Sequence, residues 1–204
     1  MNSNKMNIVI IKYNAGNIES VSNALSRLGI KAEITGDHEK IKAADKVIFP
    51  GVGEASTTMS YLKKEGLDQL IPSLMQPVLG ICLGLQLMCS HSEEGNTPCL
   101  GIFEEQVKRF VPQPGMEFTT KVPHMGWNNI TKLNSKLFDE SLENQFVYFV
   151  HSYYATVGKH IAAEGNYINS FSAALHKDNF YATQFHPEKS GPIGAKILEN
   201  FLKL

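Results

Sequence analysis

The first eighty residues alternate short apolar, β-branched runs with stretches of helical periodicity, and this rhythm constrains the fold more than any other feature. Strand patterns fall, in chain order, at residues 7–11, 31–35, 46–51 and 77–82. Helical patterns lie between them, from about 18 to 28 before Gly29 and from about 54 to 64 before Gly66. Repeated strand–helix–strand units predict an open, mostly parallel sheet with helices on both faces.

The pattern changes after about residue 99, where strands dominate. Apolar runs joined by turns lie at residues 103–110, 146–157, 160–165, 170–175 and 180–188. A final helix is predicted near 192–202. We therefore expect antiparallel strands added to the sheet in the second half, within a flavodoxin-like α/β fold. No repeat or long linker divides the chain, so a single domain over residues 1–204 is predicted.

Composition excludes several classes of function. The net charge is -1 and 43% of the residues are hydrophobic, so neither nucleic acid nor an anionic membrane is an expected partner. No apolar stretch is long enough for a signal sequence or a spanning helix, which favours a cytoplasmic protein. The three cysteines, Cys82, Cys89 and Cys99, have neither disulfide nor zinc-type spacing, so free thiols are expected.

The strongest candidate for chemistry is the run Gly80-Ile81-Cys82-Leu83-Gly84, between a strand and a helix. Glycines two residues either side of a nucleophile permit a sharp, strained turn that projects the side chain. Unpaired amides at the start of the helix would also favour a thiolate. The alternative is that Cys82 is one more small buried residue. Cys89 is expected to face inward, and Cys99 has no activating context.

A thiol nucleophile needs a base, and His186-Pro187-Glu188 at the end of a predicted strand supplies one. Alternation would put the imidazole and the carboxylate on one side, where Glu188 could orient the ring. A metal site at these residues is the alternative, but no further histidine has a suitable spacing, so no metal is predicted. The remaining candidates, His38, His91, His160 and His176, are expected to be solvated.

A glycine-rich turn, Phe49-Pro50-Gly51-Val52-Gly53, follows the third strand. It lacks the spacing of a phosphate-binding loop. The small neighbours of Val52 would leave backbone amides free to stabilise an oxyanion, with Leu83 supplying a second N–H. The alternative is a tight turn without a chemical role.

Taken together, PGVG, GICLGLQ and HPEKS resemble the triad, or class I, glutamine amidotransferases, in the same order and over most of the chain. Within that family, the segments 13–17 and 123–128 are similar to the glutaminase subunits of imidazole glycerol phosphate synthase, although Lys12 and Asn14 depart from the usual opening loop. The resemblance implies a catalytic triad of Cys82, His186 and Glu188, an oxyanion site at Gly51, Val52 and Leu83, and no cofactor. The resemblance does not explain the insert at 113–118.

The resemblance also implies a substrate and a partner. Glutamine would be bound by Gly53, Gln86, His151, Ser152 and Tyr153. Ammonia would pass to a (β/α)8 cyclase subunit in a heterodimer that makes imidazole glycerol phosphate and aminoimidazole carboxamide ribotide in histidine biosynthesis. Interface candidates are Asn17, Pro123, Trp127 and Lys189, with a core position as the alternative for Trp127. Two rival readings remain open: the same triad serving peptides or another synthase, and a binding module with an inert elbow.

Overall fold

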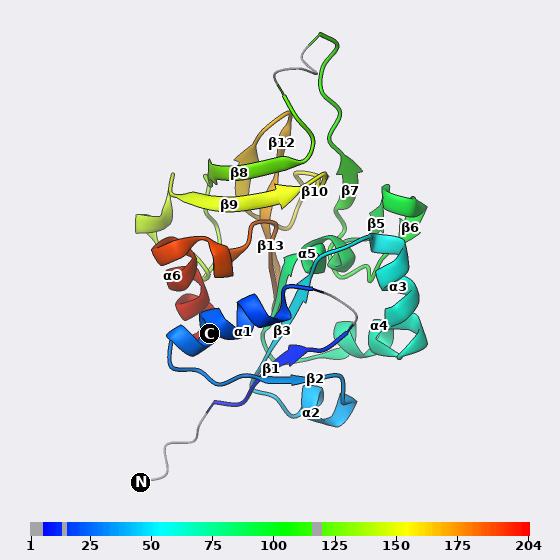
Figure 1. Cartoon of the computed structure of the whole chain (residues 1–204), viewed down its shortest axis with the longest axis vertical. Helices are drawn as coiled ribbons and strands as arrows, with labels where there is room; N and C mark the ends of the chain where they lie inside the picture. The colour runs from blue at the N-terminus through cyan, green and yellow to red at the C-terminus, as the bar shows by residue number, and fades with distance from the viewer. Residues whose placement is uncertain (1–5, 14–15, 116–119) are drawn as a thin grey trace.

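A seven-stranded sheet forms the centre of the protein, whose computed structural model describes residues 6–13, 16–115 and 120–204 (Figure 1). The strand order is β11-β12-β13-β4-β3-β1-β2. The parallel strands are β1 (Ile8–Ile11), β2 (Glu33–Thr35), β3 (Lys46–Gly51), β4 (Val78–Cys82) and β13 (Phe180–Thr183). The antiparallel strands β11 (Ile161–Asn166) and β12 (Ser170–Lys177) complete it. The prediction of a mostly parallel sheet with antiparallel additions is confirmed.

Helices cover both faces of this sheet (Figure 1). One face carries α1 (Ile18–Arg27) and α6 (Gly191–Leu202), whose buried residues share a cluster. The opposite face carries α2 (His38–Lys42), α3 (Ala55–Lys64), α4 (Leu67–Leu70) and α5 (Leu83–Met88). Sequence periodicity missed α2 and α4 because five and four residues are too few to show it.

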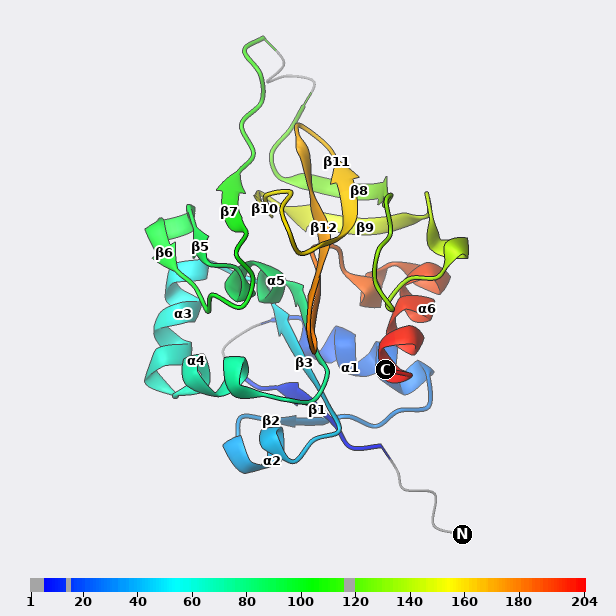
Figure 2. The ribbon, with the colours of Figure 1, turned by 180° about the vertical axis from the view of Figure 1, so that it is seen from behind.

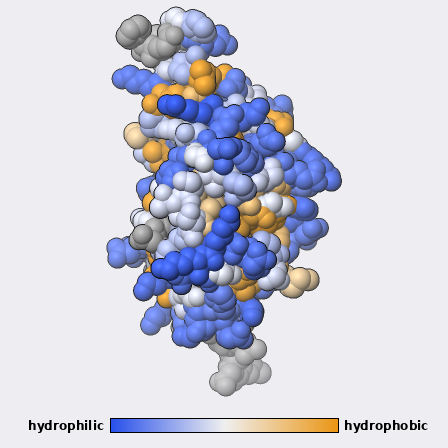
Figure 3. Space-filling view, turned by 90° about the vertical axis from the view of Figure 1, so that its right-hand side faces the viewer, coloured by the Kyte–Doolittle hydropathy of each residue, from blue (hydrophilic) through white to orange (hydrophobic). Residues whose placement is uncertain are grey.

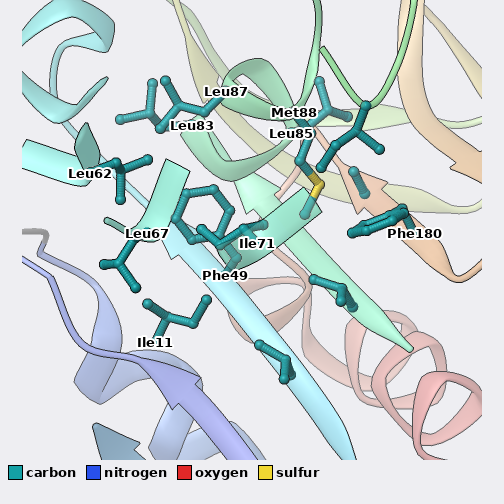
Figure 4. Packing of buried hydrophobic residues seen from close by; sticks show 14 of the residues in the cluster. Ile11, Phe49, Leu62, Leu67, Ile71, Leu83, Leu85, Leu87, Met88 and Phe180 are labelled. Atoms are coloured by element: carbon teal, nitrogen blue, oxygen red, sulfur yellow. The ribbon is translucent and has the colours of Figure 1, made fainter. Parts of the chain in front are cut away.

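Alternation along the buried strands divides the core between the two faces. Ile8 and Ile10 of β1 pack with the α1 and α6 side, whereas Val9 and Ile11 pack with the other. On that second side, the ring of Phe49 lies among side chains from the helices, including Leu62, Leu67 and Ile71 (Figure 4). Strands buried on both faces read as continuous apolar runs, which is why they were recognisable from sequence.

Two small sheets lie beside the main one (Figure 2). An antiparallel pair consists of β8 (His124–Asn129) and β9 (Phe146–His151). A four-stranded sheet has the order β10-β7-β5-β6, and its members are β5 (His91–Ser92), β6 (Thr97–Pro98), β7 (Gln106–Arg109) and β10 (Tyr153–Ala155). The apolar run at 146–157, which sequence presented as one segment, therefore divides at Ser152 between two sheets.

The short 3-10 turns η1 (Ile71–Ser73), η2 (Glu94–Asn96), η3 (Glu140–Leu142) and η4 (Pro187–Lys189) connect these elements. The flank that includes α3 is mostly hydrophilic, with apolar side chains in a few places (Figure 3). Within the described ranges, no helix has the length and apolar character needed to cross a membrane.

Three chain segments meet at the carboxyl edge of the main sheet. Gly51, the last residue of β3, pairs in register with Cys82, the last residue of β4. On the other side of β4 lies β13, whose chain continues towards His186. The sheet topology thus gathers residues that are about a hundred positions apart in sequence, at the edge where open α/β folds place their sites.

Candidate active site

Cys82 stands at a strained turn between β4 and α5. Its φ of 55° and ψ of -105° are unusual for a residue with a side chain. The turn leaves no room beside it: a Cβ on Gly84 would lie 2.1 Å from the Phe49 carbonyl oxygen, and one on Gly80 would lie 2.9 Å from the Met88 sulfur. A Cβ is excluded at Gly84 and would be tightly crowded at Gly80, and this close turn projects the thiol at the edge of the sheet.

The other two thiols have different surroundings. Cys89, directly after α5, is fully buried in the core cluster that contains the apolar residues of this helix. Burial raises its pKa well above the ordinary value. Cys99 is partly buried, and burial raises its pKa to about 11. Since the thiolate is the reactive form, both are poor nucleophiles at neutral pH. Cys82 is the cysteine that lines a cavity.

His186 and Glu188 form a buried pair after β13. The imidazole Nδ1 lies 2.7 Å from Glu188 Oε1, and neither side chain is exposed. The sequence predicted this pairing from the alternation of side chains along a strand, and that reason is wrong. The strand β13 ends at Thr183, and Pro187 begins the 3-10 turn η4 that brings the carboxylate back to the ring. Proline suits this first helical position because its missing N–H is not needed there.

The hydrogen bonding of His186 sets its protonation. Burial alone would lower the pKa of the imidazole, but the nearby Cys82 sulfur and the hydrogen-bonded Glu188 carboxylate outweigh burial and raise it. Because Nδ1–H donates to Glu188, Nε2 is the atom that can accept a proton. Among the described residues Nε2 makes no well-formed hydrogen bond, although the Cys82 sulfur is near enough to act on the pKa. The ring is oriented as a base for the thiol.

A cavity of about 310 Å³ opens beside Cys82. All five residues predicted to bind substrate line it: Gly53, Gln86, His151, Ser152 and Tyr153. Two of the predicted oxyanion residues, Val52 and Leu83, line it as well. Gly51 lies behind, where a Cβ would be 2.5 Å from the Tyr13 hydroxyl.

The cavity wall also contains residues that sequence reasoning did not assign to the site. Glu94 lines the cavity, and Gln184 joins Gln86 to the nucleophile, whereas Val150, which also lines it, belongs to the segment predicted to hold glutamine. The Nε2 group of Gln86 donates to the Tyr153 carbonyl (2.9 Å) and to Gln184 Oε1 (3.0 Å), which leaves Oε1 of Gln86 to face a ligand. Gln184 Nε2 lies 3.8 Å from the Cys82 sulfur. Its place two residues before His186 was the available signal, whereas nothing in the sequence around Glu94 marked it.

Comparisons with known proteins now bear on this geometry. The family model "Glutamine amidotransferase class-I" matches residues 9–204. This chain belongs to the class I glutamine amidotransferases. A cysteine elbow followed by a distant His-x-Glu is the arrangement expected of that family from its sequence motifs.

Curated relatives show which members of this family the chain resembles. A protein of Bacteroides thetaiotaomicron is 64% identical over 199 residues, covering 98% of this chain and 100% of the relative. One from Haemophilus influenzae is 47% identical, covering 97% and 98%, and one from Escherichia coli K12 is 42% identical, covering 98% and 100%. Each is named imidazole glycerol phosphate synthase subunit HisH.

Solved structures agree with the fold. A crystal structure titled glutamine amidotransferase has a TM-score of 0.71 at 20% identity, covering 96% of this chain and 97% of the other. PurLQS from Thermotoga maritima has a TM-score of 0.69 at 14% identity, covering 98% of both chains. At such identities the likeness concerns the class I amidotransferase fold alone.

Two neutral histidines support one wall of this amidotransferase's cavity. His151 Nδ1 lies 2.8 Å from the Tyr153 carbonyl oxygen and must donate to it, so His151 Nε2 accepts from His124 Nδ1 at 3.0 Å. Burial lowers the pKa of His151 to about 3 and that of His124 to about 4. Both rings are therefore neutral at neutral pH, and their hydrogen bonds tie β8 to the cavity wall.

The predicted interface residues have different surroundings. Trp127 is 56% exposed on the outer face of β8, so the core alternative is wrong for it. Lys189 is exposed on η4, and Pro123 lines the cavity. Asn17 has its side chain against the His186–Glu188 pair. Of the opening loop, Asn14 and Ala15 lie outside the described residues of the amidotransferase, as do residues 116–118 of the insert.

One histidine departs from expectation. His160, predicted to be solvated, is 7% exposed because the centre of its ring lies 6.0 Å from that of Phe103 and its backbone N–H donates to Glu105. His38, His91 and His176 are partly exposed. Among the residues that the structure describes, no three His, Cys, Asp or Glu side chains gather as a metal site of the amidotransferase would require.

Proposed function

We propose that this protein is the glutaminase subunit of imidazole glycerol phosphate synthase, which hydrolyses glutamine to glutamate and ammonia. The single observation that carries the proposal is the strained Cys82 turn, with the buried His186–Glu188 pair beside it, at a cavity of about 310 Å³. Relatives with the name of that subunit, up to 64% identical over nearly the whole chain, support the choice of synthase.

The reaction begins with His186 taking the proton of the Cys82 thiol. The sulfur attacks the side-chain carboxamide carbon of glutamine and forms a tetrahedral intermediate, whose oxyanion accepts hydrogen bonds from amides of Leu83 and the Gly51–Val52 turn. His186 then protonates the departing ammonia, and a glutamyl thioester remains. Water, deprotonated by His186, attacks the thioester, and glutamate and the free thiol are released. Glu188 stabilises the imidazolium each time it forms.

The cavity wall suits the amino-acid part of glutamine. Desolvation raises the pKa of Glu94 although the Ala55 N–H donates to it, which means that its charged form is costly without a counter-charge. An α-ammonium group would supply the missing counter-charge. The amide of Gly53, Gln86 Oε1, and the segment His151–Tyr153 would hold the rest of the substrate.

The partner would be a (β/α)8 cyclase that receives the ammonia. Met125 and Trp127 are 63% and 56% exposed on the outer face of β8, near the cavity that Pro123 and Val150 line. Exposed apolar and aromatic side chains grouped on one strand are typical of a protein interface, and a large tryptophan is a common anchor. Docking there would cover the cavity mouth, and ammonia would pass to the cyclase without entering bulk water.

The test compares two nitrogen sources. Synthesis of imidazole glycerol phosphate is measured with the cyclase present and with either glutamine or ammonium salt. We expect Cys82→Ala to abolish glutamine-dependent synthesis and to leave ammonia-dependent synthesis unchanged. Cys99→Ala is the matched control, because it removes a partly buried thiol that does not line the cavity, and it should keep both activities.

Two results would contradict the proposal. Full glutamine-dependent activity in Cys82→Ala would exclude the thioester route. A wild-type protein that neither releases ammonia from glutamine nor reacts at Cys82 with a glutamine-like alkylating analogue would instead be a binding module with an inert elbow.

A further inference from the structure

The side chain of Asn17 does not do what its position predicts. Asn17 is the N-cap residue of α1, where asparagine ordinarily accepts a hydrogen bond from the first turn of the helix, but its side chain makes no such bond. Asp37 and Glu54, the N-caps of α2 and α3, both cap their helices in this way. The amide of Asn17 points instead at the catalytic pair, with Nδ2 2.5 Å from Glu188 Oε1 and 3.3 Å from His186 Nδ1.

We propose that Asn17 is a positioning residue of the triad that acts through Glu188, an inference that rests on the proposed function. Its N–H and the Nδ1–H of His186 converge on the same carboxylate oxygen, Oε1. The orientation of the amide follows from this contact, because the reversed amide would set its oxygen against a carboxylate oxygen. Two donors on one oxygen fix the rotation of the carboxylate and so the plane of the imidazole.

The other carboxylate oxygen makes this second donor important. Glu188 Oε2 is buried and has no hydrogen-bond partner among the described residues. A buried carboxylate needs hydrogen bonds to offset the loss of water. All of the described contacts of this carboxylate are therefore made by Oε1. Without Asn17, the imidazole would be its only described donor, and the group could rotate away from the geometry that orients Nε2 towards Cys82.

The backbone at Asn17 allows a clean test. Its φ of 73° lies in the left-handed region, which asparagine and glycine tolerate better than other residues. Asn17→Gly therefore removes the amide and keeps the backbone conformation, and glycine is also acceptable at an N-cap. Asn17→Asp keeps the shape and places a second carboxylate against Glu188. Both substitutions change only the side chain of residue 17 and leave Cys82, His186 and Glu188 unaltered.

The experiment measures glutamine hydrolysis in the complex with the cyclase, together with the rate at which iodoacetamide alkylates Cys82. We expect Asn17→Gly to lower kcat about tenfold and Asn17→Asp about a hundredfold, the range given by losing a charge-assisted hydrogen bond and by adding a like charge. KM should stay within about twofold because Asn17 does not line the cavity. Alkylation should slow in the same order, since it reports the thiolate without glutamine.

The same substitutions at a second asparagine test whether the effect depends on the contact with Glu188. Asn144 also has a left-handed backbone, with a φ of 61°, and it is exposed. Asn144→Gly and Asn144→Asp should leave kcat and alkylation unchanged. Urea unfolding of all four variants establishes that each one folds.

The outcomes are distinguishable. If folded Asn17→Gly and Asn17→Asp retain wild-type kcat and alkylation rates, the positioning role is excluded. A larger KM with unchanged kcat would also overturn it, because that would indicate a role in binding. If the wild-type complex releases no ammonia from glutamine, the proposed function fails, and the alkylation rates still decide whether Asn17 acts on the triad.

Discussion

The nucleophile turn and the walls around it are held in place by different means. At the turn, the backbone of Phe49 leaves no space for a side chain on Gly84, so excluded volume between adjacent elements fixes the position of Cys82. The walls depend on hydrogen bonds between segments that are far apart in sequence, such as His124 with His151 and Tyr13 with the Pro50 carbonyl. One added methyl group at the turn should therefore lower the free energy of unfolding strongly. Removing a single hydrogen bond from the walls should lower it only by a small amount.

The largest effect is expected from Gly84→Ala. The new methyl group would overlap the Phe49 carbonyl oxygen at 2.1 Å, and relief requires movement of β3 or α5. We expect the free energy of unfolding to fall by about 3 kcal/mol or more, as measured by urea denaturation. Gly29→Ala is the control, because it has open space and a φ of 77°, so only backbone strain of about 1 kcal/mol is added. Equal losses in the two variants would show that the turn is not fixed by excluded volume.

A smaller effect is expected on acidification. Burial lowers the pKa of His151 to about 3 from 6.5, so the unfolded chain binds a proton in a pH range where the folded protein does not. This contribution to stability is complete above pH 6.5 and is lost as the pH falls towards 3. At pH 5 the loss is about 2 kcal/mol for this residue. His124, which faces it, acts in the same direction, and His186 is the other titratable neighbour that disfavours its charged form.

Urea unfolding at pH 7 and pH 5 measures this difference. His151→Gln should reduce the pH dependence, while His38→Gln, a partly exposed position on α2, should not. An unchanged pH dependence in His151→Gln would mean that the neutral pair does not support the wall.

The smallest effect is expected from Tyr13→Phe. Burial raises the pKa of Tyr13 well above its ordinary value, so the hydroxyl stays protonated and donates to the Pro50 carbonyl beside the oxyanion loop. Losing that bond should lower the free energy of unfolding by about 1 kcal/mol. Tyr61→Phe, at a partly buried position on α3, is the control in the same urea assay and should change little. If Tyr13→Phe lowered the free energy of unfolding as much as Gly84→Ala, the turn and the walls would not differ in how they are held in place.

Sequence predicted those parts of the molecule that short spacings encode. The positions of the buried strands along the chain and the glycine spacing around Cys82 depend on neighbours within a few residues. The pairing of His186 with Glu188 was also predicted, but its geometry comes from a 3-10 turn that strand alternation could not reveal.

The remaining features depend on contacts between distant segments. Asn17 meets Glu188 across 171 positions, and His160 is buried because Phe103 and Glu105, from the segment before β7, pack against it. Glu94 reaches the cavity wall from a 3-10 turn whose place no periodicity indicates. No local pattern of residue types contains that information.

The in-register pairing of Gly51 with Cys82 has a consequence for how the protein can vary. The spacing between the sulfur and the neighbouring loop is inherited from main-chain pairing of two adjacent strands, which any side chains compatible with a strand can maintain. Substitutions can therefore accumulate over the helices' outer surfaces without shifting the reacting atoms relative to each other. The geometry of the reacting atoms is therefore set by the backbone and depends little on the identity of most side chains.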